Sequence, residues 1–172
     1  MKKIEIQGKH NVDKIKKIKD INYVAKRDCM ANLEPVMFEH THQVKLINQM
    51  FLETLDENIN TILKKEIEKK IQSYKNQDVK KNKFTNDNIT FEQVIKKLIS
   101  SKLRCFYCKK PTYVLYNKVR DMEQWSLDRI DNDIAHTDTN VVICCLKCNL
   151  QRRVQDKEKF LLTKNFKSFK KN

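Results

Sequence analysis

Four of the six cysteines form two pairs whose spacing suits a metal ion. Cys105 and Cys108 lie in the stretch CFYC, and Cys145 and Cys148 lie in CLKC. Two thiolates in one such turn can reach a single tetrahedral Zn²⁺ at about 2.3 Å, so two pairs supply the four ligands of a closed structural site. The sequence therefore predicts a structural zinc ion. The alternatives are a redox couple at one pair, or cysteines that simply fill an apolar core.

The residues between the two pairs must form the element that brings the pairs together. They number 36, more than the roughly 15–20 of a simple zinc ribbon. Runs of β-forming residues predict strands at 113–116, 125–130 and 141–144, and helical spacing over 149–162 predicts a helix after them. So small a unit has little apolar content, and a metal site would supply the stability that it lacks.

The residues around the second pair carry a further pattern, WSLDRIDNDIAHTDTNVVICCLKCNLQRR, from Trp125 to Arg153. This pattern resembles the HNH endonuclease family, in the version stapled by two C-x-x-C pairs, and the resemblance covers residues 105–156. It is also similar to HNH proteins of phages and large DNA viruses, whose sequences are often rich in lysine and asparagine. The resemblance implies a ββα-metal unit with a treble-clef-like zinc site, and hydrolysis of phosphodiester bonds in DNA.

The resemblance assigns roles to residues at matching positions. Asp128 matches the metal-binding position on the first strand, and Asn149 matches the second metal ligand at the start of the last helix. Asn140 matches the middle Asn, which closes the loop and orients the general base. Arg129 stands where the family has its catalytic His, and a guanidinium cannot take a proton near neutral pH. We expect Arg129 to act as an electrostatic clamp on phosphate instead.

The general base then has to come from another residue. His136 is the only histidine of the unit and could activate water, although its place in the loop also fits a structural role. Asp131 is a second candidate, but Asp131, Asn132 and Asp133 are equally typical of a turn. The sequence therefore predicts a catalytic role for His136. It leaves open a structural role for His136 and the use of Asp131 as the base.

Oxygen ligands and cations surround these positions. Asp128 and Asn149 offer oxygen atoms that suit Mg²⁺ or Mn²⁺, with further coordination positions open to water and phosphate. Arg152 and Arg153 follow Asn149 by three and four residues, so in a helix they lie on its face and could hold phosphate. We therefore predict a catalytic cation at Asp128 and Asn149, separate from the zinc, and nucleic-acid contacts at Arg129, Arg152 and Arg153.

The composition fits a nucleic-acid partner. The chain has 172 residues with 36 Lys+Arg against 22 Asp+Glu, a net charge of +14. That charge suits nucleic acid, an anionic membrane or merely a lysine-rich solvated surface. One Gly and two Pro exclude a glycine-rich phosphate loop. With no run of about 18 apolar residues and no secretion signal, we expect no membrane partner and an intracellular location, cytoplasmic or nuclear, in a cellular or viral setting.

A helical half precedes this unit. Apolar residues at three- and four-residue steps predict one long amphipathic helix over 43–74, whose stripe fits a core or a homodimer seam. Polar residues at 75–88 predict a linker, and Thr90 forms a capping box with Gln93 that starts a second helix. Residues 1–40 predict short helices or a partly mobile arm. We expect an α+β protein with a helical extension and linker over 1–88 and an HNH nuclease domain over 89–172.

The expected function is that of a metal-dependent HNH-type endonuclease acting on DNA, and the sequence does not distinguish DNA from RNA. A different class is a catalytically inactive zinc-knuckle module that binds nucleic acid or a protein complex, because Arg129 replaces the usual base. A third is a structural protein that forms homodimers through the long helix.

Overall fold

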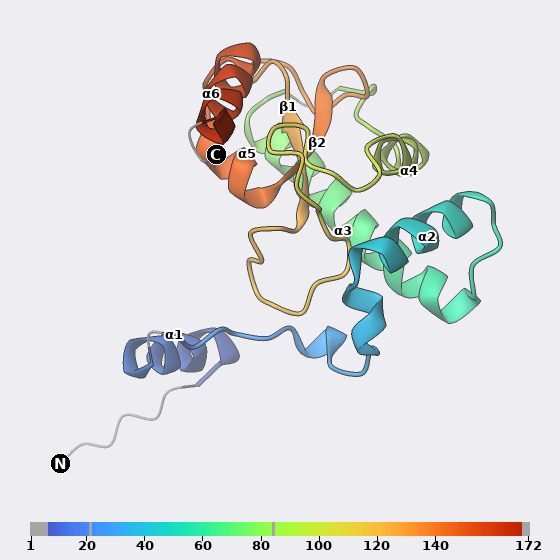
Figure 1. Ribbon diagram of the computed structural model, residues 1–172, viewed down its shortest axis with the longest axis vertical. Coiled ribbons are helices and arrows are strands. Elements are labelled where there is room, and N and C mark those ends of the chain that lie inside the picture. Colours follow the sequence, from blue (N-terminus) through green and yellow to red (C-terminus); the bar gives the residue numbers. More distant parts are fainter. Residues whose placement is uncertain (1–6, 21, 84, 170–172) are drawn as a thin grey trace.

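The computed structural model describes residues 7–20, 22–83 and 85–169 of the chain (Figure 1). Residues 1–6 of the predicted arm lie outside the described part. In order, the elements are α1 Lys9–Lys19, α2 His40–Phe51, α3 Glu57–Lys80, α4 Phe91–Ser100, β1 Trp125–Arg129, β2 Val141–Cys145, α5 Leu146–Arg152 and α6 Lys157–Phe169. Two short 3₁₀ helices, Asp28–Met30 and Pro35–Phe38, lie between α1 and α2. The expected α+β class is confirmed.

The two strands form an antiparallel hairpin that leads directly into a helix. Trp125 pairs with Cys145 and Arg129 pairs with Val141. All of β1 is buried, and α5 begins at Leu146 without an intervening loop. The predicted order of strand, strand and helix is therefore confirmed for 125–152.

The strand predicted around Tyr113 is wrong. Within residues 85–169, Tyr113 forms only an isolated bridge with Gln124. The next backbone groups bond to a buried side chain instead: Gln43 Oε1 accepts hydrogen bonds from Val114 N and Leu115 N at 2.8 and 3.1 Å. Gln43 Nε2 donates to Leu115 O at 2.8 Å. Because this amide satisfies the buried backbone, the segment needs no neighbouring strand.

The long helix predicted over 43–74 is two helices, α2 and α3, separated at residues 52–56. Asp56 caps α3, since its carboxylate accepts hydrogen bonds from Asn58 N and Ile59 N at 3.0 and 3.2 Å. Just before it, Glu53 adopts a left-handed φ of 56°. An N-cap aspartate begins a new helix, and the apolar period that runs across this position hid the break.

Helix α3 also continues through residues 75–80, the first part of the predicted linker. The apolar period fades there because the buried residue of the last turns is Asp78, not an apolar one. Helix α4 begins as predicted: Thr90 Oγ1 accepts from Gln93 N at 3.3 Å, and Gln93 Oε1 accepts from Thr90 N at 2.8 Å. The connection between α3 and α4 is thus confined to residues 81–90.

The helix predicted over 149–162 is divided into α5 and α6 at residues 153–156. Arg153 adopts a left-handed φ of 53° and ends α5. Asp156 Oδ1 then accepts a hydrogen bond from Lys159 N at 3.0 Å, which fixes the first turn of α6.

One apolar cluster joins the helical half to the hairpin. It includes Leu63 and Ile67 from α3, Leu98 from α4 and Trp125 from β1, all fully buried. Figure 1 shows α3 crossing the molecule from α2 to the hairpin. The apolar stripe of α3 therefore lies in the chain's own core, and the stripe gives no separate argument for a homodimer. Among the described helices, none combines the length and apolar character needed to cross a bilayer.

Candidate functional site

The four predicted zinc ligands lie together beside the hairpin. The Sγ atoms of Cys105, Cys108, Cys145 and Cys148 all lie within 4.8 Å of one another. Cys108 Sγ is 3.9 Å from Cys145 Sγ. Four Zn–S bonds of about 2.3 Å in a tetrahedron place the sulfurs about 3.8 Å apart. The cluster therefore fits one structural metal ion of the size of zinc.

Local hydrogen bonds aim the thiols at one point. Cys145 Sγ accepts from Cys148 N at 3.4 Å at the start of α5. In the first pair, Lys109 N donates to Cys105 O at 3.0 Å and closes the turn. Hydrogen bonds from the Cys145 and Cys148 thiols lower the pKa of Cys105, which favours a thiolate at that sulfur. Cys144 is buried beside the cluster, as predicted, and is not part of it.

Asp128 is anchored between the first cysteine pair and α5. Its Oδ2 accepts a hydrogen bond from the Tyr107 hydroxyl at 2.5 Å, and its Oδ1 accepts from Arg152 Nη1 at 3.0 Å. The side chain is buried, and burial raises the pKa of Asp128 although both donors oppose the change. Each carboxylate oxygen keeps a second lone pair, so Asp128 can still act as an oxygen ligand.

The prediction that Arg152 contacts phosphate is wrong, because its side chain is only 1% exposed. Besides Asp128, its guanidinium donates to the carbonyls of Arg129 and Ile130 at 2.5 and 2.8 Å. The seven-residue α5 packs along β1, so this position faces the strand. Arg153 lies one residue past the helix end and is exposed.

A pocket of about 380 Å³ lies between α3, the hairpin and the end of α5. It brings together five of the predicted site residues, namely Asp128, Arg129, His136, Asn149 and Arg153. Tyr74, Lys81 and Lys83, which the sequence had not indicated, also line it. Asn140 and Arg152 lie outside the pocket lining.

The two asparagines have different roles. Asn149 Nδ2 donates to Ser126 Oγ at 2.7 Å and to Leu127 O at 3.0 Å. Its Oδ1 accepts no hydrogen bond from the described residues, so this oxygen is available to a ligand. Asn140 closes the loop between the strands: its Oδ1 accepts from Asp131 N at 2.8 Å, and its Nδ2 donates to Ala135 O at 3.0 Å.

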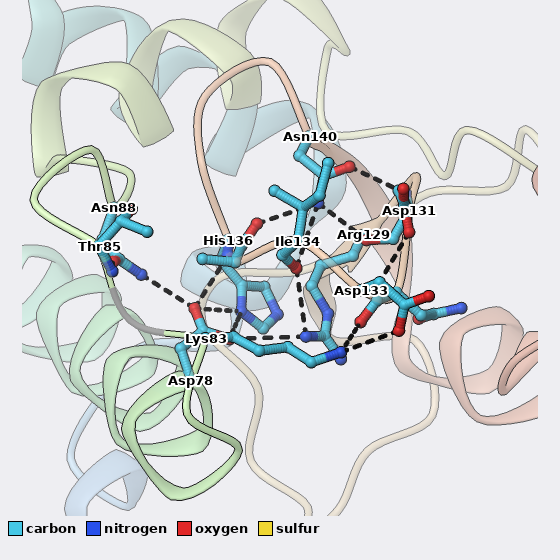
Figure 2. A network of polar contacts seen from close by, with 12 residues as sticks. Asp78, Lys83, Thr85, Asn88, Arg129, Asp131, Asp133, Ile134, His136 and Asn140 are labelled. Atoms are coloured by element: carbon cyan, nitrogen blue, oxygen red, sulfur yellow. Dashed lines mark hydrogen bonds and ion pairs between the residues drawn. The ribbon is translucent and has the colours of Figure 1, made fainter.

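A carboxylate from α3 holds this loop in place (Figure 2). The fully buried Asp78 accepts hydrogen bonds from His136 N and His136 Nδ1 at 2.8 Å and from Asn88 Nδ2 at 2.9 Å. Arg129 Nη1 lies 3.6 Å from Asp78 Oδ1. The ring of Tyr74 lies against the His136 ring, with centroids 4.8 Å apart. A residue of the predicted linker thus organises the site.

His136 keeps one ring nitrogen for chemistry. Because a carboxylate only accepts hydrogen bonds, Nδ1 carries the proton toward Asp78 and Nε2 carries the lone pair. Nε2 has no hydrogen-bond partner in the described part of the chain, and the residue lines the pocket. Burial lowers the pKa of His136 although Asp78 opposes the change, so the ring is neutral at pH 7.

Two other predicted roles change. The Arg129 side chain is 9% exposed and pairs with Asp78, and its Nη1 donates to Ile134 O at 3.4 Å. Its guanidinium therefore stabilises the loop, and the predicted clamp on phosphate becomes its secondary role. Asp131 is exposed and outside the pocket lining. Its Oδ1 accepts from Asp133 N at 2.8 Å, which makes it a turn residue and not a base.

No family model, no curated protein and no solved structure matches this chain. Sequence reasoning missed Asp78 and Tyr107. Asp78 lies in the polar run KNQDVKK, where nothing distinguishes it from a solvated residue. Tyr107 lies inside CFYC, where only its position beside two ligands could have drawn notice.

Proposed function

We propose that this chain is a metal-dependent endonuclease of the HNH type that hydrolyses phosphodiester bonds in DNA. One observation carries the proposal: a single pocket gathers oxygen ligands, an imidazole with a free nitrogen, and cations. The oxygens belong to Asp128 and Asn149, the imidazole to His136, and the exposed cations to Lys81 and Arg153. Phosphodiester hydrolysis requires these three kinds of group together.

His136 is the general base in this proposal. Its Nε2 takes a proton from the attacking water, and the Asp78 carboxylate, 2.8 Å from Nδ1, holds the ring in the required tautomer and stabilises the imidazolium that forms. Asp78 is a positioning residue, because it acts through His136. His136 in the loop, positioned by Asp78 of α3, thus takes the role of general base, which Arg129 of β1 cannot perform.

Asp128 and Asn149 would hold the divalent cation, Mg²⁺ or Mn²⁺. The donor set fits a hard cation, since Asn149 Oδ1 is unpartnered among described residues and each Asp128 oxygen retains a lone pair. When bound, such an ion neutralises charge on the scissile phosphate and on the leaving oxygen. The pocket's cations repel a lone metal ion, so we expect the metal to bind together with the phosphate.

The exposed cations position the nucleic-acid backbone. Lys81 and Arg153 both line the pocket, the first just past the end of α3 and the second just past the end of α5. Lys83 is less available, because its Nζ donates to Asn132 O at 2.5 Å and pairs with Asp133 at 3.2 Å. Lys81 and Arg153 therefore supply the phosphate contacts in place of Arg152.

The test is cleavage by the zinc-loaded protein. Plasmid, branched and single-stranded DNA are incubated with Mg²⁺, with Mn²⁺ or with excess EDTA. We expect cleavage only with metal, and its loss in His136→Ala but not in His10→Ala, which changes an exposed histidine of α1. No cleavage of any substrate with either metal overturns the proposal.

A non-catalytic nucleic-acid-binding module is the second candidate. The observation that favours it is the Asp128 carboxylate, which already accepts hydrogen bonds from Tyr107 and Arg152. That module would bind the same DNA with zinc present, and neither Mg²⁺ nor Mn²⁺ would produce a cut. The two candidates are thus separated by comparing binding with cleavage in one preparation.

A further inference from the structure

A second pocket adjoins the candidate catalytic pocket. Its volume is about 510 Å³, and it lies between α3, the segment 116–124 and α5. Tyr74, Gln77 and Asn149 line both pockets. A ligand that extends from the catalytic pocket past Asn149 on this side would therefore enter the second pocket.

The second pocket is strongly basic. Its basic side chains are Arg27, Lys69, Lys70 and Arg120, and its acidic side chain is Glu66. Glu66 already forms an ion pair with Arg27, since its Oε2 lies 2.6 Å from Arg27 Nη2 and both side chains are largely buried. Within the described part of the chain, Lys69, Lys70 and Arg120 have no carboxylate partner. Three basic side chains thus line the pocket without an ion-pair partner among the described residues.

Lys70 is the least ordinary of these cations. Its Nζ donates to Trp125 O and lies 5.0 Å from the centroid of the Trp125 ring and 5.4 Å from that of Tyr116. Burial lowers the pKa of Lys70 to about 7, although Glu66 opposes the change. An ammonium has three donors, so Lys70 can still donate to a ligand. Glu66 offsets only part of the cost of burying this charge, and an anionic ligand would favour the charged form further.

We propose that this pocket is a second phosphate site, which binds the backbone phosphate next to the scissile one on the same nucleic-acid strand. Lys70 and Arg120 are its donors, with Lys69 at the exposed edge. The proposal rests on the proposed function of the adjoining pocket, because that pocket fixes where the strand enters. It makes the substrate a strand that runs across Tyr74 and Asn149 toward Lys70.

Equilibrium binding tests the site without cleavage. Full-length zinc-loaded protein is titrated with a fluorescent 20-nucleotide DNA, single-stranded or duplex, over a series of NaCl concentrations and with no added divalent metal. Lys70→Met should weaken binding on the order of five- to tenfold and lower the slope of log K against log [NaCl] by about 0.7–0.9. Lys64→Met, which changes an exposed lysine of α3 outside both pockets, should leave both unchanged.

A second variant controls for the possibility that Lys70→Met weakens binding through misfolding. Arg120 is exposed, so Arg120→Gln should keep zinc content and thermal stability while lowering the slope by a similar amount. A wild-type slope in both Lys70→Met and Arg120→Gln overturns the proposal. Competition by polyglutamate as effective as that by the DNA would also overturn it, by assigning the pocket to an acidic protein.

Failure of this inference is distinguishable from failure of the proposed function. Binding that depends on Lys70, without cleavage by the wild type, leaves the phosphate site standing and defeats the endonuclease. Metal-dependent cleavage by the wild type, with unchanged binding and unchanged KM in Lys70→Met, supports the endonuclease and defeats the second phosphate site.

Discussion

The hydroxyl of Tyr107 donates a 2.5 Å hydrogen bond to Asp128 Oδ2. Tyr107 lies between the cysteines of the first pair, and its ring packs on Phe160 of α6 with centroids 4.9 Å apart. On the other side, Arg152 joins Asp128 to α5, the helix that begins at the second pair. Both cysteine pairs are therefore linked mechanically to the carboxylate of the candidate catalytic pocket.

Removal of zinc should consequently disorder the pocket as well as the cysteines. We predict one zinc ion per chain by elemental analysis, and loss of the near-ultraviolet circular dichroism of Trp125 when a chelator removes it. Cys145→Ser should lose zinc and the folded state of residues 105–160. Cys29→Ser changes an exposed cysteine outside the cluster and should retain both. A zinc-free yet folded wild-type protein would contradict the prediction.

Asp78→Asn tests the positioning role of the α3 carboxylate. An amide can donate to the ring as well as accept, so the His136 tautomer is no longer fixed and no charge stabilises the imidazolium. We predict a fall in the cleavage rate of at least about a hundredfold at saturating substrate, with DNA affinity nearly unchanged. Asp87→Asn, at an exposed residue of the connection between α3 and α4, is the matched control. Equal rates for the two variants would remove Asp78 from the mechanism.

The parts of the structure that the sequence predicted are those fixed by local chemistry. Cys105 with Cys108 indicated a metal through spacing alone, and Thr90 marked the start of α4 through its capping box. The contacts that the sequence did not predict are long-range ones. Asp78 reaches His136 across 58 positions, and Gln43 reaches Leu115 across 72. A polar residue that becomes buried leaves no periodic pattern in the sequence. The predicted helix therefore ended before Asp78, and a strand was predicted at Tyr113, where the Gln43 side chain satisfies the neighbouring backbone.

Arg152 and Arg153 should respond differently to the same substitution. Arg152→Ala removes a buried partner of Asp128 and leaves two backbone carbonyls without donors, so the free energy of unfolding should fall by about 3–5 kcal/mol. Arg153→Ala should leave stability unchanged and lower the salt slope of DNA binding by about one unit. Urea unfolding and salt-dependent binding of both variants measure the difference. Similar stability of the two variants would contradict the burial argument.

His136 should set the acid limb of the pH profile. Because burial lowers its pKa below the ordinary 6.5, the folded chain holds the base form at neutral pH and loses it only in more acidic solution. The cleavage rate should therefore be level near pH 7 and fall as pH drops through that lowered pKa. Stability should fall in the same window, since the unfolded chain binds this proton more readily. His136→Gln, if it folds, should abolish the stability component; a limb centred above pH 7 would exclude His136.

Lys70 should make a contribution of the same sign, at higher pH. Its pKa is about 7 in the folded chain, while an unfolded lysine keeps its proton to about pH 10.4. Between these values the unfolded chain binds more protons, so wild-type stability gains up to about 1.4 kcal/mol per pH unit from this residue as pH rises. Lys70→Met lacks that gain, and its stability relative to the wild type should be highest at pH 6 and decline steadily toward pH 9. Urea denaturation of both proteins across this range gives the difference directly, because all other titrating groups are shared. If the two curves run parallel, Lys70 is an ordinary solvated lysine and burial in the second pocket does not disfavour its ammonium form.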